Sequence, residues 1–437
     1  MRSPLLLASI SVALAAVAAC AASGDDPGPR PSEEESDGGL YGSDADVREA
    51  EVDVPPIEPP TCSDAGWCVT PFPDSDLMFK DIWPLPGRAF AIAQSKTLGV
   101  KVLEWEDASA TWKYIDDDTQ NDPGFGDHVG RMWAAGDNEL YFTVSPGTIY
   151  HGTRKAPGDD WAWSRHQLED HSPDQNPFHD HGHPTYRNLV FNDARQTYPA
   201  LGVWGFGSDD VYAWYSNTIY HLTSSDGGPL EWTPEYIAAD VDSADEHLYV
   251  LGAAGTDPND VWFSIARDDD SLDSACAVVV RKTSAGYQRI VDGTVGWFRM
   301  CTSKPGFASV DGTNGWLTDL QAQAPDRFVG LKGGRDVVQI SVQGDSYAVA
   351  TEQVPYTLTL DRTPLFSLWS APDSRLWLSG WAAVAQGDEV WDGGAFQLST
   401  ISLNGAPLDR PMYQVRGISS SNLWAVGVRY AFHKTTP

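Results

Sequence analysis

Three observations predict an all-β fold for most of this 437-residue chain. From Thr61 onward, short runs of aromatic and β-branched residues alternate with Gly, Pro, Asp, Asn and Ser, and helical periodicity is almost absent. A hydrophobic residue, often Trp, stands about eight positions before a second aromatic, and this pattern recurs seven times. At about 375 residues, the folded part is too long for one β-sandwich. Together these observations predict a β-propeller.

The second aromatic of each repeat marks one strand of each blade. These residues are Phe90, Tyr141, Tyr212, Trp262, Phe328, Trp377 and Trp424. A third strand follows, and it is clearest in the identical tetrapeptides at residues 148–151 and 218–221 and weaker at residues 389–391. With a further Trp-containing segment after a turn, each repeat offers four strands, which predicts seven four-stranded blades.

The spacing of the second aromatics locates two insertions. Successive spacings are 51, 71, 50, 66, 49 and 47 residues. A four-stranded blade needs roughly 40 to 50 residues, so extra chain follows Tyr141 and Trp262. We expect function at these insertions, because binding groups tend to lie on loops held by a rigid scaffold.

The seventh repeat is too short to complete its own blade, because only ten residues follow Gly427. An incomplete last sheet would expose open edges, and propellers commonly avoid this by taking a strand from the other terminus. Residues 66–71, which contain Trp67, are predicted to supply that strand. The alternative is six blades with a degenerate terminal hairpin.

The N-terminal residues resemble an export signal. Arg2 precedes an apolar run that is too short to span a membrane, and small residues end it, as in a secretory signal peptide covering residues 1–19. The sequence Val-Ala-Ala-Cys at residues 17–20 resembles the lipobox of bacterial lipoproteins. That resemblance implies a lipid on Cys20, and Ala21 after it implies the outer membrane. The alternative is an ordinary signal peptide with an incidental Cys.

Residues 20–60 are predicted to form a disordered acidic tether to the propeller at residues 61–437. Residues 21–60 contain twelve acidic and two basic side chains and have no periodic apolar pattern. Residues 61–437 carry a net charge of −23 out of −32 for the whole chain. Nucleic acid and anionic lipid headgroups are therefore poor partners. We expect a monomer whose only membrane contact is the lipid.

Four further cysteines are predicted to form disulfides in an oxidising compartment. Proximity in sequence pairs Cys62 with Cys68 and Cys276 with Cys301. The alternative is free buried thiols or a metal site, although the zinc spacing of paired cysteines is missing.

The repeat, with its aromatic-Gly, Asp-Val-Trp and Ile-x-His segments, resembles the WD40-like propeller repeats of a large group of bacterial surface lipoproteins. The resemblance covers residues 62–437 and implies fold rather than activity. Residues 224–232 also resemble the Asp-box turn of sialidases and photosystem assembly factors, with one extra residue before Trp232.

A histidine tract in the longer insertion is a candidate metal site. His179, His181 and His183 alternate along the chain, so on an extended strand their imidazoles share one face and are within reach of one Zn or Cu ion. The alternative is a solvated polar loop. Weak Ca is considered at two acidic loops, at residues 116–127 and 268–273, where solvated surface acid is the alternative.

Catalytic motifs are missing. The chain lacks a Gly-x-Ser-x-Gly elbow and a phosphate loop ending in Lys-Ser or Lys-Thr. A sialidase would need converging arginines, for which Arg131, Arg187, Arg299 and Arg416 are candidates, but the Arg-Ile-Pro signature is missing.

The 18 tryptophans divide into two groups. Most occupy repeat positions and are predicted to pack between blades: Trp83, Trp133, Trp204, Trp262, Trp369, Trp377 and Trp424. The better candidates for a binding face are Trp161, Trp163, Trp297, Trp316 and Trp381.

These features predict a lipid-anchored envelope propeller that acts as a noncatalytic binding module for a protein, peptide or glycan and needs no cofactor. The alternatives are a sialidase-like or lyase-like enzyme with its site at the ring centre, and an envelope assembly factor.

Overall fold

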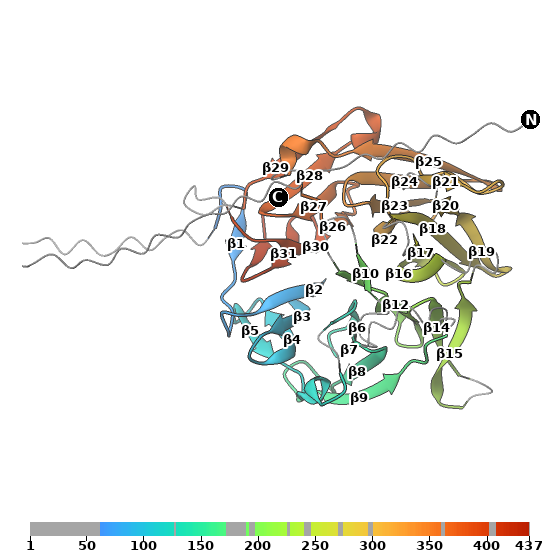
Figure 1. Cartoon of the computed structure of the whole chain (residues 1–437). Coiled ribbons are helices and arrows are strands. Elements are labelled where there is room, and N and C mark those ends of the chain that lie inside the picture. The colour runs from blue at the N-terminus through green and yellow to red at the C-terminus, as the bar shows by residue number, and fades with distance from the viewer. Residues whose placement is uncertain are drawn as a thin grey trace, which may run out of the picture. The chain divides into compact units, whose positions relative to one another are not determined.

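The computed structural model describes residues 62–125, 128–171, 189–191, 197–224, 228–239, 246–269, 274–295, 300–359, 363–401 and 408–436. Within these residues, seven four-stranded antiparallel sheets surround one axis as the blades of a propeller (Figure 1). The prediction of seven blades is confirmed, and the six-blade alternative is wrong. Among the described residues, no helix has the length and apolarity that crossing a membrane requires.

The blades follow one another along the chain. Blade 1 contains β2 (Met78–Leu85), β3 (Arg88–Ser95), β4 (Gly99–Glu106) and β5 (Thr111–Tyr114). Blade 2 contains β6 (Trp133–Gly136), β7 (Glu139–Val144), β8 (Thr148–Thr153) and β9 (Ala162–Gln167). Blade 3 contains β12 (Leu201–Gly207), β13 (Asp210–Tyr215), β14 (Thr218–Ser224) and β15 (Leu230–Ile237). Blade 4 contains β16 (Glu246–Asp257), β17 (Asp260–Asp269), β18 (Ser274–Thr283) and β19 (Gly286–Val291).

The remaining blades include the closing one. Blade 5 contains β22 (Leu317–Ala324), β23 (Arg327–Lys332), β24 (Asp336–Gln343) and β25 (Ser346–Gln353). Blade 6 contains β26 (Ser367–Ser370), β27 (Leu376–Gly380), β28 (Ala383–Asp388) and β29 (Ala395–Ser399). Blade 7 contains β30 (Met412–Ser419), β31 (Asn422–Gly427), β32 (Ala431–Lys434) and the N-terminal strand β1 (Trp67–Val69). Short 3-10 helices lie at η1 (Thr119–Asn121), η2 (Tyr356–Leu358) and η4 (Val390–Asp392).

The repeat positions fall where the sequence places them, with one exception. Each second aromatic lies on the second strand of its blade and is at most 1% exposed. The tetrapeptides at residues 148–151 and 218–221 lie on the third strands β8 and β14. Residues 389–391 are not the third strand of blade 6, which is β28. Glu389 precedes η4, and residues 390–391 belong to it. Glu389 and Gly393 both have positive φ (47° and 85°), which turns the chain out of the sheet there.

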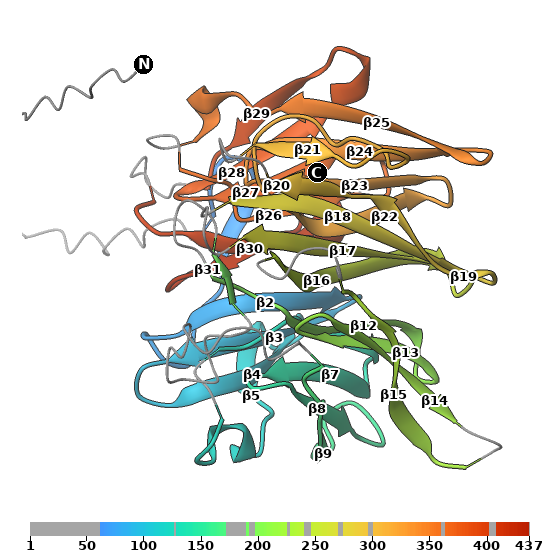
Figure 2. The ribbon, with the colours of Figure 1, turned by 45° about the vertical axis from the view of Figure 1, so that its right-hand side comes forward.

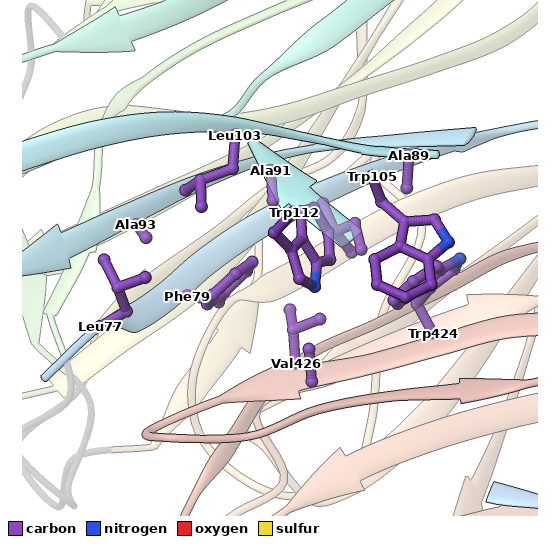
Figure 3. Close-up of a cluster of buried hydrophobic side chains, with 12 residues drawn as sticks. Leu77, Phe79, Ala89, Ala91, Ala93, Leu103, Trp105, Trp112, Trp424 and Val426 are labelled. Atoms are coloured by element: carbon purple, nitrogen blue, oxygen red, sulfur yellow. The ribbon is translucent and has the colours of Figure 1, made fainter. Parts of the chain in front are cut away.

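The hydrophobic core lies between neighbouring blades, as blade 1 and blade 7 illustrate (Figure 3). The rings of Trp105 and Trp112 lie 5.5 and 5.4 Å from the ring of Trp424, and all three are at most 5% exposed. Such tilted and edge-on aromatic pairs contribute about 0.5 to 1.5 kcal/mol each beyond the burial of their area. The repeated tryptophans therefore hold the blades together.

The ring closes through the N-terminal strand, as predicted. β1 pairs with β32, with Trp67 opposite Lys434 and Val69 opposite Phe432, so it forms the outer strand of blade 7. The buried Trp67 donates its Nε1–H to Ser399 Oγ of blade 6 at 2.8 Å. A disulfide joins Cys62 to Cys68 and fixes the turn that leads into β1.

The antiparallel order gives the ring two distinct ends. Within each blade the first and third strands run in one direction, and the second and fourth strands run in the opposite direction. The turn from the second to the third strand and the connection to the next blade therefore lie at the same end of the ring, which we call the insertion end. The other turns lie at the opposite end, the hairpin end; those before β19 and β25 are on the right of Figure 2. Two additional hairpins, β10 (Leu189–Phe191) with β11 (Thr197–Pro199) and β20 (Gly293–Val295) with β21 (Cys301–Ser303), belong to blade-to-blade connections. The described parts of both insertions therefore belong to connections at the insertion end.

Candidate functional site

A charged network joins inner strands from different parts of the ring. Arg131, which precedes β6, donates from Nη2 to Asp319 Oδ1 of β22 at 2.7 Å. Its Nη1 donates to Gln414 Oε1 of β30, also at 2.7 Å. One guanidinium thus links blades 2, 5 and 7, and its planar fork suits simultaneous contacts in two directions.

The two carboxylates of this network are buried and fully engaged. Asp81 Oδ2 accepts from the backbone N–H of Met132 at 2.9 Å, and Arg131 and Arg416 approach Asp81 Oδ1 at 3.7 and 3.5 Å. Asp319 Oδ2 accepts from the backbone N–H of Leu368 at 3.2 Å. The side chains of both aspartates are at most 2% exposed. Each carboxylate therefore ties its own blade to the next one and is compensated by arginine.

Two of the four arginines considered for a sialidase site meet at this network. Arg131 and Arg416 both face Asp81, so their charges are directed to a carboxylate of the protein itself. Burial lowers the pKa of Arg416, while Asp81 raises it. Arg187 and Arg299 lie outside the described residues.

At the hairpin end, a polar group stacks on the second aromatic in several blades. The imidazole of His151 lies parallel to the Tyr141 ring at 4.2 Å, and its Nε2 is 3.0 Å from Glu139 Oε1. In blade 3, His221 stacks on Tyr212 at 4.1 Å, with Nε2 2.8 Å from Asp210 Oδ1. In blade 4, the Arg281 guanidinium lies over the Trp262 ring and donates to Asp260. In blade 7, His433 stacks on Trp424 and lies within hydrogen-bond distance of Asn422.

These stacks explain the acidic residue that precedes the aromatic in the repeat. It orients the polar group of the third strand over the ring, so it has a structural role. The hydrogen bond with His151, together with those from Ser208 and Tyr141, lowers the pKa of Glu139 to about 2 against burial. Sequence reasoning missed this arrangement, although its signal was visible: a polar residue two positions before the aromatic and another on the facing third strand.

The second insertion is anchored in blade 4. The predicted disulfide between Cys276 of β18 and Cys301 of β21 is present. Beside it, Asp292 is 2% exposed and binds Arg267 Nη2 at 2.8 Å and Arg289 Nη1 at 3.1 Å. Asp292 also accepts from the backbone N–H of Gly293, where β20 begins. These contacts fix the hairpin of the insertion to its blade.

The candidate metal ligands His179, His181 and His183 lie outside the described residues. Of the same tract, His166 is exposed on β9, and His171 stacks on Tyr220 with ring centroids 6.1 Å apart. Among the residues that the structure describes, no group of three His, Cys, Asp or Glu side chains is placed to hold a metal.

The first acidic loop is bound by the protein. Lys101 Nζ lies 3.1 Å from Asp116 and 2.7 Å from Asp118. Asp116 also accepts from the backbone N–H of Val102. In the second loop, Asp268 and Asp269 belong to β17, and residues 270–273 lie outside the described part.

The tryptophans proposed for a binding face behave differently from one another. Trp316 is only 5% exposed, so its assignment to a binding face is wrong; it packs beside Leu251 and Ala266. Trp163 packs edge-on against Phe142, and Trp161 lies 4.5 Å from the Arg154 guanidinium. Trp381 is 38% exposed, and Trp297 lies outside the described residues.

Exposed apolar side chains gather at one end of the ring. Eight large hydrophobic residues of the described part remain exposed, and only Leu230, at the start of β15, lies at the hairpin end. The other seven lie in turns, connections or fourth-strand ends at the insertion end: Leu98, Tyr114, Ile237, Met300, Tyr356, Trp381 and Leu398. Tyr356 is 50% exposed, and the Arg335 guanidinium lies 3.3 Å from its ring centroid. This end, with both insertions, is the candidate functional site.

Comparisons with solved structures bear on the fold. The structure of YCF48 bound to D1 peptide matches with a TM-score of 0.52 and 12% identity over 87% of this chain and 100% of that one. YCF48 from Cyanidioschyzon merolae matches with a TM-score of 0.53 and 12% identity over 84% of this chain and 98% of that one. The β-propeller domain of Cps50 (Swd1) from Myceliophteria thermophila matches with a TM-score of 0.50 and 9% identity over 85% of this chain and 100% of that one. No protein-family model and no curated protein matches the sequence. At these identities the likeness shows the fold alone, and that fold is the seven-bladed β-propeller.

Proposed function

We propose that this protein is a lipid-anchored envelope module that binds a protein or peptide partner at the insertion end without catalysing a reaction. The observation that carries the proposal is the asymmetry of the ring. Of the eight large apolar side chains that are exposed in the described part, seven lie at that end, and so do the connections that carry the two insertions. Exposed apolar side chains that gather on one surface are typical of interaction sites.

Aromatic and cationic groups at this end suit a polypeptide ligand. Tyr356 presents a ring backed by Arg335, and Trp381 presents a large half-exposed ring. Tyrosine, tryptophan and arginine are the residues that most often dominate protein interfaces. The YCF48 structure that resembles this chain holds a peptide, which supports the same use of a similar ring. A glycan that stacks on the same rings is the alternative ligand.

The engagement of the inner carboxylates favours binding over catalysis. An acid or base for glycan chemistry needs a carboxyl group that is free to exchange a proton with substrate. Asp81 and Asp319 are instead held by arginines and backbone N–H groups of the neighbouring blade. The alternative is a sialidase-like or lyase-like enzyme, and turnover of glycosides or polysaccharides that is lost in Asp81→Asn would overturn our proposal.

The anchoring part of the proposal rests on Cys20 and the acidic residues 21–60. The chain enters the ring through Cys62 and β1, and β1 starts at the hairpin end because it is antiparallel to the third strand β32. The described chain therefore enters the ring at the end opposite the candidate binding end. Lipid attachment would place the native chain in the membrane fraction, and Cys20→Ser would release it. Recovery of both proteins in the soluble fraction would contradict the anchor.

Crosslinking tests the binding face. The native protein is crosslinked in envelope preparations, and its partners are compared with those of the double variant Tyr356→Ala, Trp381→Ala. Leu230→Ala is the matched control, because Leu230 is 47% exposed but lies at the hairpin end. We expect the double variant alone to lose the partner. Equal capture by all three proteins would exclude the insertion end.

A further inference from the structure

Lys80 is an unpaired cation on the inner rim. It lies near the start of β2, at the insertion end, and is partly buried. Among the described lysine and arginine side chains that are buried or partly buried, Lys80 alone has no hydrogen-bond acceptor and no carboxylate partner within the described residues. Within the described residues, the ammonium of Lys80 makes a cation–π contact with the ring of Tyr413, whose centroid is 4.5 Å from Nζ.

The surroundings of Lys80 favour an anion. Desolvation by burial lowers the pKa of Lys80, and no negative group of the described residues opposes this effect. A nearby negative charge would restore the charged form of the lysine. Tyr413 provides a second donor, because its hydroxyl makes no hydrogen bond within the described part of the chain, and burial raises its pKa so that it keeps its proton.

The backbone places both side chains through irregular pairing. In β2 the register with β3 shifts between Phe79 and Asp81, which makes Lys80 the extra residue. In β30 the register with β31 shifts between Met412 and Gln414, which makes Tyr413 the extra residue. Such β-bulges redirect a side chain and often lie next to functional sites. Two bulges on facing inner strands therefore bring one cation and one hydroxyl together.

We propose that Lys80 and Tyr413 form a receptor for a carboxylate of a partner peptide, at the inner rim where blades 7 and 1 meet. The inference rests on the proposed binding function and gives it a ligand chemistry: an acidic side chain or a C-terminus. The ammonium neutralises the charge, and the Tyr413 hydroxyl donates a hydrogen bond to a carboxylate oxygen.

The experiment uses the full chain without its signal peptide, with Cys20→Ser so that it stays soluble. Its lysines are labelled by reductive ¹³C-methylation, and NMR follows Lys80 during titration with the peptide acetyl-Asp-Glu-Asp-Glu-amide. The amide analogue acetyl-Asn-Gln-Asn-Gln-amide is the uncharged probe. We expect the Lys80 signal to move with the acidic peptide only, and its pKa to rise when the peptide is bound.

Two variants assign the effect. Lys80→Gln should weaken binding of the acidic peptide by about tenfold or more, because the charge-assisted contact is lost. Lys96→Gln is the matched control, because Lys96 is an exposed lysine of the same blade at the same end. Tyr413→Phe should weaken binding less and should keep the ring beneath the ammonium. An equal loss in Lys96→Gln and Lys80→Gln would show a general surface charge effect and would overturn the proposal.

The outcome separates this site from the proposed function. If the acidic peptide leaves the Lys80 signal unchanged while envelope crosslinking still captures a partner at the insertion end, the carboxylate site is wrong and the binding function stands. If the peptide binds through Lys80 while no partner is captured, the carboxylate site stands and the proposed function fails.

Discussion

Arg131 and Asp319 lie 2.7 Å apart, although 188 residues separate them and they belong to blades 2 and 5. Neighbouring blades are held by apolar packing and by carboxylate contacts with the backbone, whereas this pair connects blades that are not neighbours. Asp319 has a φ of 49°, which is rare for a residue other than glycine. This conformation costs free energy, and the contacts with Arg131 and with the N–H of Leu368 offset it.

Arg131→Met should destabilise the protein strongly. It leaves the Asp319 carboxylate, whose side chain is 2% exposed, without its cation. Removing one partner of a buried pair costs about 3 to 5 kcal/mol, which urea unfolding can measure. The matched control is Arg165→Met, because Arg165 and Asp122 form an exposed pair at 3.3 Å and should contribute little. In the double variant Arg131→Met, Asp319→Asn, part of the loss should be recovered; strictly additive losses would contradict a direct coupling.

Trp67→Ala tests whether the N-terminal strand closes the ring. Trp67 is fully buried, contacts Trp377 edge-on at 5.9 Å and donates to Ser399 of blade 6. Truncating a buried aromatic costs about 3 to 5 kcal/mol, so a large fall in the free energy of unfolding is expected. Trp381→Ala, at a 38% exposed position, should cost far less. Similar losses in the two variants would mean that β1 does not contribute to closure.

The acid stability of the ring should depend on Glu139. Its pKa is about 2 in the folded protein, below the ordinary value of 4.5. A carboxyl group whose pKa is lowered on folding stabilises the protein fully above the unfolded pKa, and this contribution is lost as the pH falls through the folded pKa. Glu139→Gln should therefore be less stable than the parent above about pH 4.5, and the difference should shrink as the pH falls toward 2. Chemical denaturation across this pH range measures the difference, and parallel curves would rule out the link with His151.

His433 should make the closing blade sensitive to pH in a different range. It is 6% exposed and stacks on Trp424 at 4.0 Å, and burial lowers its pKa from the ordinary 6.5. Below pH 6.5 the unfolded chain takes up a proton that the folded chain resists, so stability falls as the pH drops until the folded pKa is passed. His433→Gln should remove this dependence. Thermal unfolding of both proteins between pH 7.5 and pH 5 provides the comparison, and equal slopes would contradict the prediction.

Local and periodic features of the fold could be predicted from the sequence. The second aromatics recur because every blade buries the same position of its second strand, so their spacing reveals blades and insertions. The closing strand followed from the shortage of residues after Trp424, and the disulfides followed from proximity in sequence. In each case the constraint acts within one blade or at one junction.

Features that depend on ring geometry could not be predicted. The contact between Arg131 and Asp319 requires closure of the ring, which no spacing along the chain encodes. Trp316 looked like a surface residue because it stands outside the repeat, but the packing of the second insertion buries it. The sequence did not single out Lys80, because its position depends on the bulge in β2 and on its contact with Tyr413 of blade 7.

The histidine tract remains the metal prediction of this chain. His179, His181 and His183 carry side chains that bind Zn or Cu, and alternate positions on an extended strand bring them to one ion. Protein incubated with Zn at neutral pH and then desalted should retain about one ion per chain, measured by elemental analysis. The triple variant His179→Asn, His181→Asn, His183→Asn should lose the ion, whereas His166→Asn, from β9, should keep it. A stoichiometry near zero in the unmodified protein would exclude the site, because three imidazoles that converge on one ion would retain it through desalting.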